Sequence, residues 1–124
     1  MIDFSNKSLI KLKQEDKSKG IAAVKELLID GENVIDSYVS MRDRVVFTNK
    51  RIISVNVQGL TGKKVDYTSI PYSRIQAYSV ETAGFFDLDA ELDLFLSGLG
   101  KIRFELRGSS NIVALCKAIS EYIL

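Results

Sequence analysis

The stretch ELDLFLSGLGKIRFELR, residues 91–107, decides the fold because apolar and polar side chains alternate on both sides of a glycine-containing turn. The apolar positions of this alternation are Leu92, Leu94, Leu96, Ile102, Phe104 and Leu106. A period of two is typical of a strand that buries one face and leaves the other in water. Gly98 and Gly100 supply the turn between the two runs. The stretch therefore predicts an antiparallel hairpin with one apolar face.

Five more short runs, rich in β-branched and aromatic residues, precede this hairpin. They cover residues 34–42, 44–48, 51–57, 63–70 and 74–82, with turn residues between them. Strands joined by connections of this length form antiparallel hairpins. The seven strands together predict a mainly β fold, an antiparallel sandwich or barrel.

The C-terminal residues 109–124 predict an amphipathic helix that Ser109 or Ser110 caps. Its apolar stripe comprises Ile112, Leu115, Cys116, Ile119 and Ile123. A stripe of this kind needs an apolar surface to cover. We therefore expect the helix to close an open end of the strands.

The first 30 residues predict a helical segment in front of a main domain of residues 31–124. Ile21, Val24, Leu27 and Leu28 share one helical stripe, and Gly31 is well placed to end the helix. The earlier stretch is a weaker pattern that predicts either a short helix or an arm. Its apolar residues, Phe4, Leu9 and Leu12, leave three alternatives open: docking on a neighbouring copy, contact with a membrane surface, or fraying.

The composition indicates one ordinary globular domain: 124 residues, of which 46% are apolar and 27% charged. A formal net charge of +1 argues against a protein dedicated to nucleic-acid binding. The single cysteine, Cys116, excludes an internal disulfide and fits a reducing compartment. The sequence has neither a signal-peptide pattern nor an apolar run long enough to span a bilayer. We expect a soluble cytoplasmic protein.

The carboxylates at Asp87, Asp89 and Glu91 invite a metal site, but their pattern does not continue as a calcium-binding loop does. The chain contains no histidine to bind a transition metal or to act as a general base. QGLTGKK, residues 58–64, lacks the spacing of a phosphate-binding loop and is read as a turn. The sequence therefore predicts neither a metal, nor a cofactor, nor an enzyme.

Four motifs within residues 45–92 carry a family resemblance. They are FTNKR at residues 47–51, GLTGKK at 59–64, SIPY at 69–72 and VETAGFFDLDAEL at 80–92. In this combination the sequence resembles the bacterial pleckstrin-homology-like domain family. The resemblance implies a seven-stranded pleckstrin-homology-like sandwich with a capping C-terminal helix. It also implies ring-like homo-oligomers, no enzymatic activity and no settled ligand.

The motif at residues 80–92 also suggests a contact surface. Adjacent residues of an extended chain point to opposite sides, so one ring of the pair is expected in the core and the other at the surface. Members of the family that the sequence resembles usually carry a smaller or polar residue at the position of Phe85, which implies that Phe85 is the exposed ring and Phe86 the buried one. An exposed aromatic ring beside acids such as Asp87 and Asp89 is a common interface arrangement, in which the ring supplies buried area. The expected function is a binding or assembly module whose copies contact one another through Phe85, Phe86, Asp87 and Asp89.

The alternative function is peripheral binding of anionic lipid or phosphate headgroups. The resemblance implies that three loops meet at the open end of the sandwich. These loops would carry Arg42, Arg44, Lys63, Lys64 and Lys101. Lysine and arginine in such a cluster form charge-assisted contacts with phosphate. The alternative is that these charged side chains are ordinary solvated surface residues that bind no ligand.

Overall fold

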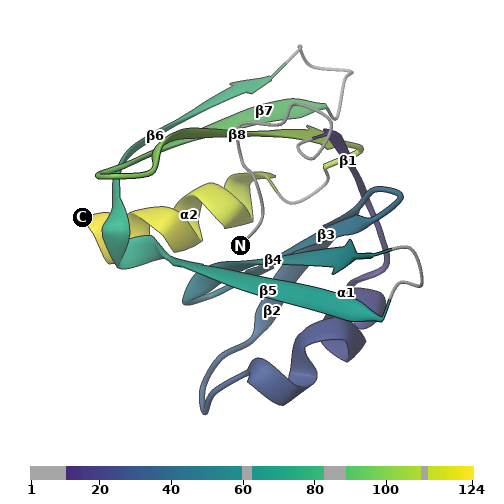
Figure 1. Ribbon diagram of the computed structural model, residues 1–124. Helices are drawn as coiled ribbons and strands as arrows, with labels where there is room; N and C mark the ends of the chain where they lie inside the picture. The colour runs from purple at the N-terminus through teal and green to yellow at the C-terminus, as the bar shows by residue number, and fades with distance from the viewer. Residues whose placement is uncertain (1–10, 60–62, 83–88, 110–111) are drawn as a thin grey trace.

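The computed structural model describes residues 11–59, 63–82, 89–109 and 112–124, and its core is a single sheet of eight strands (Figure 1). In chain order the strands are β1 Lys11–Gln14, β2 Val34–Val39, β3 Asp43–Thr48, β4 Arg51–Gln58, β5 Lys64–Pro71, β6 Ile75–Thr82, β7 Ala90–Leu96 and β8 Gly100–Arg107. Their order in the sheet is β5-β4-β3-β2-β1-β8-β7-β6. All neighbours are antiparallel except β1 and β8. The sheet is open, and β5 and β6 are its edges.

The sheet folds into two layers around helix α2, which spans Ile112–Ile123 (Figure 1). Strands β6, β7 and β8 lie on one side of α2 and β2 to β5 on the other. We call the face of each strand that is turned toward α2 its inner face. On the inner face, Tyr38, Phe47 and Phe104 pack edge to face, with ring centroids 5.7 and 6.2 Å apart. Such aromatic packing adds to the area that these rings bury.

Helix α1, Lys17–Val24, and the short 3-10 helix η2, Lys25–Leu27, cover the outer face of the sheet. A second, smaller cluster lies there, formed by Val24, Val34, Val46, Ile53 and Val55. Asp16 caps α1 by accepting a hydrogen bond from the Ser18 backbone N–H at 2.8 Å. Gly20 permits close packing, because a Cβ built on it would lie 2.5 Å from the Cβ of Ser37. The helix therefore sits directly on β2.

The seven strands and the C-terminal helix expected from the sequence are confirmed, as is the pleckstrin-homology-like layout. The expected stripe of α2 packs on the core, with Leu115 and Ile119 fully buried. Ser109 is also buried, and its hydroxyl lies 2.5 Å from that of Tyr38. Burial raises the pKa of the Tyr38 phenol well above its usual range, so this group stays neutral.

The N-terminal region differs from the expectation of a helix or an arm. Lys11–Gln14 is a strand, and it joins the sheet between β2 and β8. Leu12 is buried in the main core, so residues 11–14 belong to the sheet that the sequence assigns to residues 31–124. Within α1 and η2, Val24 is buried as expected, whereas Ile21 and Leu27 remain exposed at the surface.

None of the helices in the described parts of the chain is both long and apolar enough to cross a bilayer.

Candidate functional site

The FTNKR motif forms a turn that is locked to the loop before β2. The Thr48 hydroxyl donates a hydrogen bond to Glu32 at 2.7 Å and accepts bonds from the backbone N–H groups of Lys50 and Arg51 at 3.0 Å each. Arg51 completes the lock by donating to both carboxylate oxygens of Glu32, at 2.9 and 3.0 Å. The SIPY motif joins this network, because the Tyr72 hydroxyl donates to the Thr48 carbonyl at 2.6 Å. Two of the family motifs are therefore structural anchors.

A second network fastens the junction of β1 and α1 to the sheet. Arg44 donates to both oxygens of Glu15, at 2.6 and 3.2 Å, and the Ser37 hydroxyl donates to the same carboxylate at 2.6 Å. Burial disfavours the charged form of Glu15, but these donors outweigh it and hold the pKa of Glu15 below its ordinary value. Arg44, which the sequence nominates for anion binding, is thus already paired inside the chain.

The structure brings together some of the five basic residues nominated for anion binding, but not all. Arg42 donates to the Gly59 carbonyl at 3.2 Å, which places it beside the β4–β5 connection; Lys63 ends that connection, and Lys64 begins β5 opposite Gln58. Both lysines are exposed. Lys101 lies at the start of β8, where its ammonium nitrogen is 3.7 Å from a carboxylate oxygen of Asp93. The opposite end of β8 is the one that lies at the same end of the sheet as Arg42.

The position of Lys101 follows from strand register. Arg107 at the end of β8 pairs with Lys13, Lys13 pairs with Val39, and Val39 pairs with Arg44. Lys101 precedes Arg107 by six residues of extended chain, or about 20 Å. Lys13 and Arg107 therefore lie at the same end of the sheet as Arg42, Lys63 and Lys64, and we call this the basic end of the sheet, although Arg107 also lines a hollow with the acidic residues Glu81, Asp89, Glu91 and Glu105. The sequence pattern does not nominate Lys13 and Arg107, because the pairing of β1 with β8 cannot be read from either strand alone.

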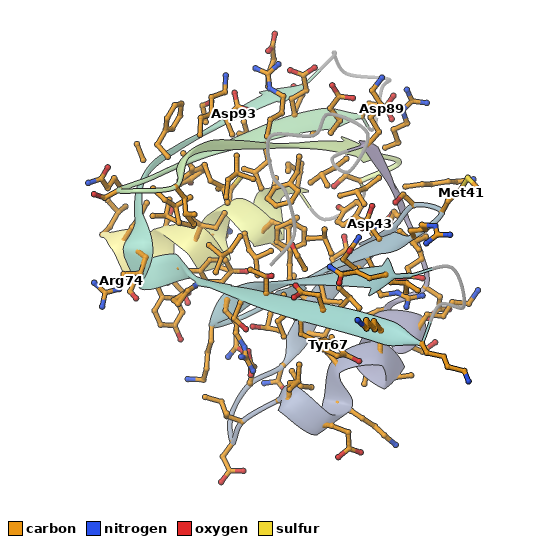
Figure 2. The ribbon with its side chains drawn as sticks, viewed as in Figure 1. Met41, Asp43, Tyr67, Arg74, Asp89 and Asp93 are labelled. Atoms are coloured by element: carbon orange, nitrogen blue, oxygen red, sulfur yellow. The ribbon has the colours of Figure 1, made fainter. Side chains whose placement is uncertain are left out.

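Three of the residues nominated for a contact surface, Phe85, Phe86 and Asp87, lie outside the described residues. In the sequence they follow Thr82, the last residue of β6, by a few positions. Asp89 is described and exposed, and one of its carboxylate oxygens accepts a hydrogen bond from the Gly108 backbone N–H at 3.1 Å. Figure 2 shows Asp89 and Asp93 on the β7 side of the molecule, remote from Tyr67 on β5.

Acidic side chains form a row across the outer face of β6, β7 and β8. Glu81 pairs with Glu91, and Glu91 pairs with Glu105. Like charges directly opposite each other destabilise a sheet. Arg103 relieves part of this repulsion: it lies 3.7 Å from Glu91 and 2.8 Å from Asp93, whose pKa it lowers. Within the described ranges, no three acidic, cysteine or histidine side chains are grouped so that they could hold a metal ion.

Both edge strands expose apolar side chains. On the outer face of β5, Tyr67 is 46% exposed and Val65 is 42% exposed. On the inner face of β6, Val80 is 39% exposed, although its cross-strand partner Leu92 is fully buried. Apolar side chains at an unpaired edge are unusual, because edges of soluble proteins are normally protected by charge, proline or a bulge.

Beside Val80 lies an apolar groove of about 640 Å³ between β6 and α2. It is lined by Tyr78, Val80, Thr82, Ile112, Val113, Cys116, Lys117, Ser120 and Glu121. The Tyr78 hydroxyl is engaged by Ser120 at 2.7 Å and by the Cys116 carbonyl at 3.3 Å, so the polar atoms here are largely satisfied. Burial raises the pKa of the Cys116 thiol, which makes it a neutral part of the lining. The groove lies within the volume range of ligand and peptide sites.

Comparison with known proteins identifies relatives of this chain. It is 52% identical over 81 residues to YjqA of Bacillus subtilis (strain 168), covering 62% of this chain and 65% of YjqA. It is 34% identical over 76 residues to YozO of the same strain, covering 61% of this chain and 66% of YozO. In both cases the matched part spans less than two thirds of the relative.

Solved structures cover the chain more fully. A DUF1696 family protein with a pleckstrin-homology domain from Shewanella loihica PV-4 is 38% identical, with a TM-score of 0.71, covering 92% of this chain and 98% of that one. A pleckstrin homology domain from Shewanella amazonensis SB2B is 44% identical, with a TM-score of 0.58, covering 89% and 90%. The family model for the bacterial PH domain matches residues 3–123. The chain therefore belongs to the bacterial PH domain family.

Proposed function

We propose that this domain is a non-enzymatic assembly module whose copies join through the two open edges of the sheet. PH domains are in general binding modules without catalytic activity. The observation that carries the proposal is the open sheet, in which β5 and β6 each have one neighbouring strand among the described residues. An unpaired edge presents backbone N–H and C=O groups that can pair with another chain.

The two edges suit each other as a head-to-tail contact. Each strand is eight residues long, and each exposes apolar side chains. β5 and β6 are different surfaces, so a contact between them is heterologous. Such contacts close into rings where the rotation permits and form open filaments where it does not. In Figure 1 the two strands meet at one corner and then diverge, so the start of β5 and the end of β6 lie apart.

The test is the solution mass of the native chain over a range of concentrations, by size-exclusion chromatography with light scattering. The expected mass is a multiple of 13.8 kDa that is reached as concentration rises. A constant mass of 13.8 kDa at all concentrations would overturn the proposal.

A second candidate function is binding of anionic lipid or phosphate headgroups. The observation that favours it is the basic end of the sheet, where Lys63 and Lys64 are exposed beside Arg42. Juxtamembrane basic groups contribute roughly 1 kcal/mol each at an anionic surface. The test is cosedimentation with phosphatidylserine vesicles, with phosphatidylcholine vesicles as the control. Binding that Arg42→Glu with Lys63→Glu abolishes supports it, and absence of native binding at low salt excludes it.

A further inference from the structure

One wall of the groove between β6 and α2 is the outward edge of β6, which has no partner strand within residues 11–59, 63–82, 89–109 and 112–124. This edge indicates what kind of molecule would fill the groove. In an antiparallel pair, every second residue of β6 turns its N–H and C=O groups away from β7. Water can solvate such a row of backbone groups, and an extended polypeptide can replace that water by pairing with every one of them. The surface that lines the groove is mostly apolar, with Lys117, Ser120 and Glu121 as the polar members that α2 contributes. The added strand therefore needs apolar side chains at alternate positions on its α2 side.

Strand β5 of this same chain meets that description. Its outer edge is likewise without a partner in the part of the chain that the structure describes, and Val65 and Tyr67 stand two residues apart on one face. That face is the outer one, since Tyr67 pairs with Val55, a member of the cluster under α1. Both side chains are more than two fifths exposed in the single chain, so both have area to bury on a second copy.

The direction of pairing follows from the topology. Seven neighbouring pairs link β5 to β6 through the sheet, and six of them are antiparallel, so the two edge strands run the same way. Suppose that a second copy extends the sheet with its inner face on the same side as the inner face of the first copy. Its β5 would then lie parallel to β6 of the first copy. Antiparallel addition instead turns the outer face of the incoming β5 toward α2. Only antiparallel addition therefore aims Val65 and Tyr67 into the groove.

The charges of Lys64 and Glu81 favour one register between the incoming β5 and the receiving β6. In the antiparallel arrangement Lys64, on the inner face of the incoming strand, shares a face with Glu81 of the receiving strand. Both residues are exposed, and they occupy matching ends of the two strands. Placing Lys64 opposite Glu81 also places Val65 opposite Val80 and Tyr67 opposite Tyr78. Opposite charges and apolar pairs are the cross-strand neighbours that stabilise sheets.

We infer that β5 of a second copy adds antiparallel to β6 and fills the groove beside α2 with Val65 and Tyr67, with Lys64 meeting Glu81. The inference rests on the proposed self-association and specifies the interface. It also gives the acidic row a role, because a lysine at the end of that row reduces its like-charge repulsion.

The test uses Cys116, which lines the groove and is the only cysteine in the sequence. Tyr67→Cys places a thiol at the position that should enter a neighbour's groove. A short bismaleimide then links it to Cys116 of the next copy, under mildly alkaline conditions because burial raises the thiol pKa. The expected result is a ladder of covalent multimers on a denaturing gel.

Two matched controls define the outcome. Thr68→Cys, on the other face of β5, and Tyr67→Cys combined with Cys116→Ser should both give no ladder. A Tyr67→Cys variant that remains oligomeric by light scattering but gives no ladder, or gives the same ladder as Thr68→Cys, overturns the inference and leaves self-association standing. A native chain that is monomeric at all concentrations overturns both.

A charge exchange tests the register without a cross-linker. Lys64→Glu and Glu81→Lys should each weaken association, by about threefold, because each places like charges opposite each other. The double variant should recover native association. Failure of the double variant to recover, with both singles folded and weakened, would show that these residues are not partners and overturn the register.

Discussion

The guanidinium of Arg51 lies 2.9 Å from the carboxylate of Glu32, a side chain with no exposed surface. This contact connects the turn between β3 and β4 to the loop before β2, across 19 residues of sequence. Thr48 donates to the same carboxylate, and Tyr72 in turn donates to the Thr48 carbonyl. The FTNKR and SIPY motifs therefore supply hydrogen bonds that hold together the layer formed by β2 to β5.

The first prediction concerns Arg51→Leu, which should lower the free energy of unfolding by about 3 kcal/mol, because it leaves Glu32 buried without its partner charge. Urea denaturation measures the change. Arg74→Leu is the matched control: Arg74 is exposed at the corner between β5 and β6, and its loss should cost less than about 0.5 kcal/mol. Equal effects of the two variants would show that the Glu32 pair contributes nothing beyond surface charge.

The second prediction is acid destabilisation through the same pair. Burial opposes ionisation of Glu32, but hydrogen bonds from Arg51 and Thr48 outweigh it and hold its pKa below the ordinary value of 4.5. Because the folded pKa is depressed, the stabilisation is complete above pH 4.5 and is lost as pH falls through the folded pKa. Urea midpoints measured from neutral to acid pH should therefore fall on the acid side. In Arg51→Leu this fall should become shallower, and an unchanged slope would contradict the assignment to Glu32.

The third prediction concerns the contact between α1 and β2. Gly20→Ala normally favours a helix, by up to about 1 kcal/mol. Here the added Cβ would lie 2.5 Å from the Cβ of Ser37, so the variant should instead lose about 1–3 kcal/mol. Lys19→Ala, at an exposed position of the same helix, is the control and should be nearly neutral. A stabilised Gly20→Ala protein would mean that α1 does not pack closely on β2.

The sequence pattern predicts the strands well because alternation depends only on which face is buried. Leu92, Leu94 and Leu96 are all buried on the inner face, as their spacing indicates. The same pattern does not give strand partners. The row of Glu81, Glu91 and Glu105 arises only from register, and so does the neighbourhood of Lys13 and Arg107.

The short strand β1 shows a second limit. KLKQ offers one buried residue, Leu12, which is too little signal to separate a strand from one turn of helix. Its place between β2 and β8 depends on partners that are distant in sequence, including the Glu15–Arg44 pair that holds the following residue. The groove beside α2 is unpredictable for the same reason, because it joins β6 to a helix 30 or more residues later.

The final prediction tests the connection after β6. If the proposed self-association uses the contact expected from the sequence, Phe85→Asp should lower the solution mass, because an aromatic ring at a contact supplies buried area that a carboxylate cannot. Light scattering at matched concentration gives the mass, and far-ultraviolet circular dichroism verifies folding. Phe95→Asp is the control, since Phe95 is 38% exposed on the outer face of β7, an interior strand that forms neither edge of the sheet. An unchanged mass for Phe85→Asp, with Tyr67→Asp dissociating the oligomer, would confine the contact to the paired edges and remove residues 85–87 from it.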